Sequence, residues 1–231
     1  MEQKQNIWFV TLILTAIAGY CDTITFVAAD KIFSAHVTGN FIVFAYQLVK
    51  GSDNDAWIKL MTFPVFIISV MIAGRIADKV VNKHYLLFFE GLILIAAGFL
   101  AYLLGYIQNQ EITWPMYLVV MMVVFAMGFQ NAYGKLFAKD TFGPTTMMTG
   151  NVTQISLDLK GLIISRFSNV DYLENFKRGA ITIGGFLAGC ILGAYIGKLF
   201  GLAGILVPGI AMVICYLYTK SSAKETQSQI G

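Results

Sequence analysis

The sequence has little charge. Asp, Glu, Lys and Arg make up 13% of its 231 residues, about half of the roughly 25% that soluble domains carry. The 16 Lys and Arg residues are spread between apolar stretches, and this distribution argues against the basic face that nucleic-acid binding requires. Hydrophobic residues are abundant instead, at 57%, in several runs of about 20 residues. This composition predicts an all-α polytopic membrane protein whose main partner is the lipid bilayer.

Cysteine and histidine are scarce as well. Cys21, Cys190 and Cys215 lie inside apolar runs without CxxC spacing, so we interpret them as small core residues and not as a disulfide set. The two histidines are too few for a metal site, although His36 is a candidate pH-sensitive group. No HExxH, GxSxG or paired-Asp constellation occurs within the apolar runs. We therefore expect no metal, no cofactor and no enzyme activity.

Six apolar runs are long enough to cross a bilayer as helices. They comprise residues 7–29, 57–76, 85–107, 114–133, 180–200 and 205–218. The first run is too long for the apolar part of a signal peptide, so we expect it to be retained. The last run is short, and residues 201–204 before it are expected to form a tight hairpin. Residues 220–231 form a polar tail that we expect to be disordered.

A repeated tripeptide organises the rest of the sequence. Thr38-Gly39-Asn40 and Thr149-Gly150-Asn151 each open a short segment. Each also follows an apolar run that ends in glycine, an aromatic residue and two polar residues, namely Gly19-Tyr20-Cys21-Asp22 and Gly128-Phe129-Gln130-Asn131. The match predicts a single membrane domain with two internal repeats, at about 7–107 and 114–219. The segments that the tripeptides open are too short or too polar to be lipid-facing spans, and we expect two half-helices.

These motifs resemble the two signatures of the YoaK-like family, a group of bacterial multi-span membrane proteins with a domain of unknown function. The first signature is carried by Gly19 to Asp22 followed by residues 36–40, and the second by residues 127–132 followed by residues 148–151. The resemblance extends from the first apolar run to the last. It implies a multi-pass protein of the bacterial inner membrane but no particular substrate, so function has to be argued from the residues.

The positions of Lys and Arg favour six spans with both termini in the cytoplasm. If neither half-helix crosses the membrane, most basic residues fall on the cytoplasmic side, as the positive-inside rule requires. A seven-span arrangement with the N-terminus outside fits equally well, but it treats the two repeats differently. Three spans in each repeat place the repeats in opposite orientations, with the two half-helices entering from opposite faces. Inverted repeats with partial helices near the midplane are typical of transporters.

Asp22 is the leading candidate for a functional carboxylate. A charge at membrane depth costs about 2.5–3.5 kcal/mol on insertion scales, so such a residue usually faces the interior of the bundle or a wet cavity. We interpret Asp22 as a cation or proton site, and the alternative is an Asp that only accepts hydrogen bonds from a neighbouring helix. Asn131 occupies the matching place in the second repeat and cannot ionise, and Gln130 lies beside it.

The half-helices carry further polar residues. Thr and Asn of each tripeptide suit a helix N-terminus, where they cap exposed amides, while Gly39 and Gly150 allow close approach. Gln47 and Asp158 each follow the Asn of their tripeptide by about two turns, on the same helix face. A stripe of this kind could line a water-filled path. The alternatives are a tight helix crossing and, for the second segment, an amphipathic helix on the membrane surface.

Two more features concern packing. Glycine recurs every four residues in the fifth run, at Gly185, Gly189, Gly193 and Gly197. Such a face predicts close packing of helices, either between the repeats or between the protomers of a homo-oligomer. Glu90, near the start of the third run, is expected to lie near the membrane interface, where it either extends toward the headgroups or pairs with Arg75, Lys79 or Lys83.

The leading functional hypothesis is a transporter of a small solute or ion, with a midplane site between the repeats. The residues assigned to its path are Asp22, Thr38, Gly39, Asn40, Gln47, Gln130, Asn131, Thr149, Gly150, Asn151 and Asp158. Coupling to protons through Asp22 is a further hypothesis. The alternatives are a passive channel and a membrane scaffold or regulatory subunit that transports nothing.

Overall fold

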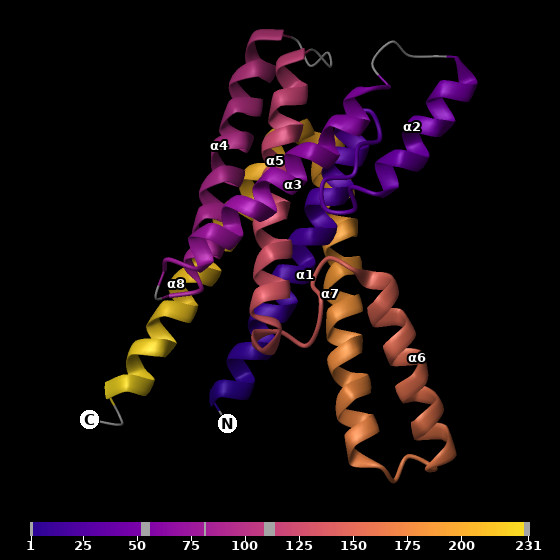
Figure 1. Cartoon of the computed structure of the whole chain (residues 1–231), viewed down its shortest axis with the longest axis vertical. Coiled ribbons are helices and arrows are strands. Elements are labelled where there is room, and N and C mark those ends of the chain that lie inside the picture. Colours follow the sequence, from indigo (N-terminus) through magenta and orange to yellow (C-terminus); the bar gives the residue numbers. More distant parts are fainter. Residues whose placement is uncertain (1, 52–55, 81, 109–113, 229–231) are drawn as a thin grey trace.

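The computed structural model of the chain describes residues 2–51, 56–80, 82–108 and 114–228 (Figure 1). Within these ranges the secondary structure is entirely helical, so the predicted all-α polytopic fold is confirmed. The main helices are α1 (Glu2–Ala28), α2 (Gly39–Lys50), α3 (Ile58–Ala77), α4 (Tyr85–Gln108), α5 (Trp114–Leu136), α6 (Met148–Ile164), α7 (Val170–Phe200) and α8 (Leu206–Ser228). Two 3₁₀ helices, η1 (Ala138–Asp140) and η2 (Gly201–Ile205), follow α5 and α7.

Five segments of the described chain are long and apolar enough to cross a membrane. The first four lie in α1, α3, α4 and α5. The fifth, Val170–Lys220, contains both α7 and α8, which meet at η2 where Gly201 has a φ of +57°. α8 continues to Ser228, so the expectation of a disordered tail from residue 220 is wrong as far as the described residues reach. The helix carries the polar residues of the tail beyond the apolar run.

Helix contacts in one half of the chain have counterparts in the other half. α1 packs against α7, and α5 packs against α3. α4 lies against α5 as α8 lies against α1, and α2 contacts α3 as α6 contacts α7. α4 and α8 contact each other. Exchanging α1–α4 with α5–α8 therefore leaves this pattern of contacts unchanged.

Glycine makes the central contact between the halves possible. A Cβ added to Gly189 of α7 would overlap the carbonyl oxygen of Ala16 on α1, and one added to Gly193 would lie 2.5 Å from the oxygen of Tyr20. Gly185 and Gly197 face Thr15 and Ile24 of the same helix. The glycine face of α7 thus lies against α1, which places the closest helix packing between the two halves.

The two short helices begin at the tripeptides and extend in opposite directions. α2 starts at Gly39 and α6 starts one residue before Thr149. Figure 1 shows α2 running toward the upper end of the molecule and α6 running toward the lower end, where α1 begins and α8 ends. The 12 residues of α2 cover about 18 Å, which is short of a bilayer core of about 30 Å. Neither helix is among the candidate spans of the described residues.

Candidate functional site

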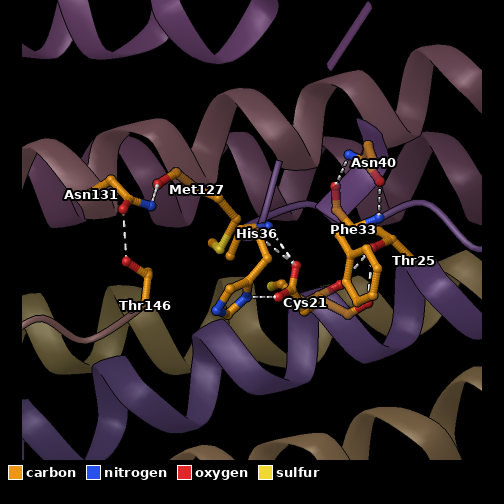
Figure 2. Close-up of polar contacts among 10 residues, drawn as sticks. Cys21, Thr25, Phe33, His36, Asn40, Met127, Asn131 and Thr146 are labelled. Carbon is orange, nitrogen blue, oxygen red and sulfur yellow. Dashed lines mark hydrogen bonds and ion pairs between the residues drawn. The ribbon is translucent and has the colours of Figure 1, made fainter. Parts of the chain in front are cut away.

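Asp22 holds the loop after α1 inside the helix bundle. It lies about two turns before α1 ends at Ala28, about 9 Å from the helix end. Its Oδ1 accepts hydrogen bonds from the backbone N–H groups of Ala35 (2.6 Å) and His36 (3.2 Å), and its Oδ2 pairs with Nδ1 of His36 (Figure 2). The Asp22 residue is only 4% exposed. The loop therefore folds back along α1 before α2 begins.

The chain reverses direction after α1 through two residues with left-handed backbone conformation. Asp30 and Lys31 have φ values of +51° and +61°, which few residues other than glycine adopt without support. Support comes from Asp30, whose carboxylate pairs with Nζ of Lys59 at the start of α3. Lys59 is completely buried, so this ion pair ties the loop after α1 to the start of α3.

Asn131 fixes the equivalent loop in the second half. It lies about one and a half turns before α5 ends at Leu136, and its Oδ1 accepts a hydrogen bond from Oγ1 of Thr146 at 2.7 Å (Figure 2). Its Nδ2 donates to the carbonyl oxygen of Met127 at 2.9 Å. Asp22 and Asn131 therefore have the same structural role at matching places in the two halves, but only Asp22 carries a charge.

The asparagines of the two tripeptides close the loops in the same way. Nδ2 of Asn40 donates to the carbonyl oxygen of Phe33, and Nδ2 of Asn151 donates to that of Pro144, in each case seven residues earlier. Asn40 also accepts from the N–H of Phe33 and donates to Oγ1 of Thr62. Asn40 is fully buried, whereas Asn151 is half-buried and has fewer partners.

The helix-capping role predicted for the tripeptides is wrong. Thr38 is the N-cap of α2 but forms no side-chain cap, and the N-cap of α6 is Met147, which has no capping oxygen. Thr38 and Thr149 are exposed. Gly39 lies close to the ring of Phe33, but no atom lies within 4 Å of a Cβ built on Gly150. The close approach expected of both glycines therefore exists only at Gly39.

Gln47 and Asp158 are both buried, but their surroundings differ. Nε2 of Gln47 lies 3.4–3.5 Å from the carboxylate of Asp30, next to the buried Lys59. The carboxylate of Asp158 accepts from Nε2 of Gln154 at 3.2–3.3 Å. Gln47 therefore lies beside an ion pair, whereas Asp158 borders open space.

That space is a cavity of about 580 Å³ beside α6 and α7. Its lining includes Asn151, Gln154 and Asp158 from α6, Arg178 from α7 and Lys139 from η1. Ile7 also lines it, which places the cavity near the first turns of α1. Arg178 pairs with Glu174 on its own helix and lies over the ring of Phe142. The lining of the cavity is partly polar and partly apolar, and it carries charge of both signs.

A second cavity, of about 400 Å³, contains the Asp22–His36 pair. Its lining consists of Asp22, Thr23, Phe26, Phe33, His36, Phe186 and Cys190. The hydrogen bond with Asp22 raises the pKa of His36 above its ordinary range, and this effect outweighs the opposing effect of burial. The pair is therefore a hydrogen-bonded carboxylate–imidazole unit with one edge on a cavity.

Gln130 lies apart from both cavities. Its Nε2 donates to the carbonyl oxygen of Leu14 on α1 (2.7 Å) and to Oγ1 of Thr145 (3.0 Å), and the residue is fully buried. These bonds join α5, α1 and the second loop. The structure thus brings Asp22 and Asn131 to their loops and Asn151 and Asp158 to one cavity, while Gln130 contacts only backbone and a loop side chain.

Sequence reasoning misplaced Glu90 and gave His36 too little weight. Glu90 is fully buried, and neither of its carboxylate oxygens has a hydrogen-bond partner among the described residues, so the expected pairing with Arg75, Lys79 or Lys83 is wrong. Lys83 instead pairs with Asp140 at 2.5 Å. For His36 the available signal was its position two residues before the first tripeptide. Among the described residues, no group of three or more His, Cys, Asp and Glu side chains could hold a metal ion.

Comparisons with known proteins agree with the membrane assignment. The model of the family described as "Protein of unknown function (DUF1275)" matches residues 10–218. The UPF0700 transmembrane protein YoaK of Bacillus subtilis (strain 168) is 21% identical over 186 residues, which cover 78% of this chain and 79% of that protein. No solved structure matches the chain.

Proposed function

Since the chain belongs to the DUF1275 family, whose function is unknown, we propose a function from its own residues: it is a transporter that moves a small solute or ion across the cytoplasmic membrane. The solute passes through a site between two inverted halves, α1–α4 and α5–α8. Both chain termini lie in the cytoplasm. The protein performs no chemistry on the solute.

The observation that carries this proposal is the pair of loops that fold back into the bundle. One is bonded to Asp22 of α1 and the other to Asn131 of α5, and each leads into a short helix. α2 and α6 then extend to opposite ends of the molecule (Figure 1). Discontinuous helices at matching places in two opposed repeats are a recurring way of building a substrate site within a membrane.

The difference between the two ends supports alternating access. In the first half, near Gln47, an ion pair joins the buried Lys59 to Asp30, and we interpret it as the closed end of the path. The matching region near Asp158 opens on the cavity of about 580 Å³. A site that is open at one end and closed at the other is what a transporter needs in each of its conformations, whereas a passive channel must be open at both ends.

The Asp22–His36 pair supports proton coupling. Asp22 is ionisable and buried, and its counterpart Asn131 is neutral. Intramembrane carboxylates next to a second titratable group commonly serve as proton relays in transporters. We assign the coupling proton to this pair, with the Asn131 side providing hydrogen bonds alone.

A metabolite screen on a deletion strain tests transport directly. The strain lacking the protein is compared with strains carrying the wild-type chain or Asn151→Ala at equal amounts in the membrane. Asn151 is half-buried and bonds mainly to Pro144, so its loss should cost little stability while removing a polar group from the cavity. The wild-type chain is expected to change the distribution of at least one small solute between cells and medium, and Asn151→Ala should reduce that change several-fold.

The same screen separates transport from scaffolding. A scaffold predicts no change in solute distribution with the wild-type chain, together with aggregation or lost assembly in the variant. If the wild-type chain leaves every solute unchanged, the proposed function is wrong.

A further inference from the structure

The cavity beside Asp22 has an unusual combination of walls. Phe26 of α1 and Phe33 of the loop lie with ring centroids 4.9 Å apart and form one side. Phe186 of α7 forms another side, with the ring of His36 edge-on to it at 5.7 Å. Asp22 supplies the one carboxylate of the lining, and neither Lys nor Arg is among the residues that line it. Three phenyl rings and a carboxylate therefore line an open, mostly apolar hollow of about 400 Å³.

We propose that this cavity binds a small organic cation, an amine or a quaternary ammonium compound, as the solute of the transport function proposed above. The inference rests on that function and names its substrate class. Asp22 supplies the negative charge, and the phenyl rings of Phe26, Phe33 and Phe186 supply the surfaces on which the cation lies.

The chemistry of the walls selects a cation over other solutes. Aromatic faces attract cations, and the attraction grows when the site is desolvated, which is why aromatic cages recognise quaternary ammonium groups. An anion would be repelled by Asp22 and would find neither Lys nor Arg in the cavity lining. A sugar would find few hydrogen-bonding side chains in the cavity lining beyond Asp22, Thr23 and His36. The volume is in the range of small-molecule sites.

Because of His36, a proton and the cation compete at this site. Protonated His36 neutralises Asp22 through Nδ1. A cation placed at the same carboxylate removes that stabilisation, so His36 releases its proton when the cation binds. The other titratable groups near the pair are the thiols of Cys190, which lines the cavity from α7, and Cys21, which lies next to Asp22 in α1 and is buried. One proton is therefore released for each cation that binds.

The sign of the pH dependence follows from this competition. The bond with Asp22 raises the pKa of His36. Below the raised pKa the imidazolium occupies Asp22 and the affinity for the cation is low. As the pH rises through the raised pKa, the imidazole becomes neutral and the affinity increases. By linkage, the factor by which the proton weakens cation binding equals the factor by which the cation weakens proton binding.

Binding of phenyltrimethylammonium to the purified full chain in lipid nanodiscs tests the proposal without any knowledge of the natural solute. Isothermal titration calorimetry is run from pH 5 to pH 8, in buffers of different ionisation enthalpy so that released protons are counted. We expect saturable binding that strengthens with pH, release of up to one proton per cation below the raised pKa of His36, and no displacement by tert-butylbenzene, the neutral isostere.

Matched variants assign the binding to the cavity. Asp22→Asn should weaken the affinity about tenfold or more, whereas Asp171→Asn, an exposed carboxylate of α7, should not change it. Phe186→Leu should weaken it about fivefold, and Phe99→Leu, on the exposed face of α4, should not. His36→Gln is the second variant, for the case in which Asp22→Asn does not fold. This variant should bind the cation with an affinity that no longer depends on pH in this range, and without proton release.

The outcomes separate this inference from the transport function. Binding that tert-butylbenzene displaces, or binding that Phe186→Leu and His36→Gln leave unchanged, overturns the cation site. If the cation fails to bind while the metabolite screen identifies an anionic or neutral solute, the protein is a transporter and the substrate class is wrong. If the cation binds as described but no solute moves in cells, the site stands and the transport function is wrong.

Discussion

Replacing Asp22 by asparagine is expected to abolish solute transport and to return the pKa of His36 toward its ordinary value. Asp22 accepts three hydrogen bonds from Ala35 and His36, one of them from the imidazole. The hydrogen bond to this carboxylate is the main cause of the raised pKa of His36. An amide keeps part of the loop geometry but holds no charge, so the variant should fold while losing its coupling group.

Two measurements check this result. Transport of the solute found by the screen is followed in proteoliposomes as a function of pH, and the imidazole signals are titrated by NMR. The chain has only two histidines, so His84, whose pKa burial lowers, serves as the internal reference and should not move. Asp171→Asn is the matched control. Wild-type transport with an unchanged pH profile in Asp22→Asn would show that the pair does not couple protons.

The Asp22–His36 pair also predicts a pH dependence of stability. A group whose pKa is raised in the folded state stabilises the fold fully below its unfolded pKa, and that stabilisation disappears as the pH rises through the folded pKa. The pKa of His36 is raised. The contribution of the pair should therefore be present at acidic pH and lost on going to alkaline pH, and Asp22→Asn should remove it.

Gly189→Ala is expected to be the most destabilising small substitution in the transmembrane core. A methyl group at this position would overlap the carbonyl oxygen of Ala16, so α1 and α7 would have to separate along their main contact. Overpacking of this kind costs about 1–3 kcal/mol and occasionally more. Gly184→Ala is the matched control, because no atom lies within 4 Å of the added Cβ. There alanine should be neutral, or stabilising by about 0.5–1 kcal/mol.

Thermal unfolding with a thiol-reactive fluorophore measures both variants. Cys21 and Cys215 are buried, so their reaction reports on opening of the bundle. The midpoint of Gly189→Ala should fall by many degrees relative to that of Gly184→Ala. Equal midpoints would mean that α1 and α7 do not approach each other as closely as described.

Much of the fold could be predicted from the sequence because membrane helices have a strong and local signal. The six apolar runs all lie within helices of the structure to within one residue, and the tripeptides mark the starts of the two short helices equally closely. Backbone groups in lipid must be satisfied within their own segment, so an apolar run of about 20 residues allows few alternatives.

The contacts of the site could not be predicted, because they join residues far apart in the sequence. The tripeptide sequence does not indicate that Asn40 forms hydrogen bonds with Phe33 and Thr62 instead of capping a helix. The same residue type in the second repeat, Asn151, has no such neighbour on α7 and stays half-buried. The chain reversal at Asp30 and Lys31 determines which loop residues reach Asp22. Because neither position is a glycine, the sequence does not indicate this reversal.

Glu90 shows the limit of helical periodicity. α4 is apolar on all sides, so its sequence does not indicate which face is turned to lipid and which to the bundle. A carboxylate in its second turn could equally have reached the interface. The structure places it in the interior, without a hydrogen-bond partner among the described residues. The assignment of Asp22, Asn131, Asn151 and Asp158 to a transport path remains a prediction.

The account depends most directly on the opposite orientation of the two halves, and side-specific cysteine labelling tests it. Ser52 lies outside the described residues, so Lys50→Cys at the end of α2 is paired with Ser168→Cys between α6 and α7. Both positions are exposed. In intact cells a membrane-impermeant maleimide should label Lys50→Cys above the level of the parent chain, and should label Ser168→Cys only after the membrane is opened. Labelling of both from the same side would contradict the inverted halves and, with them, the proposed site.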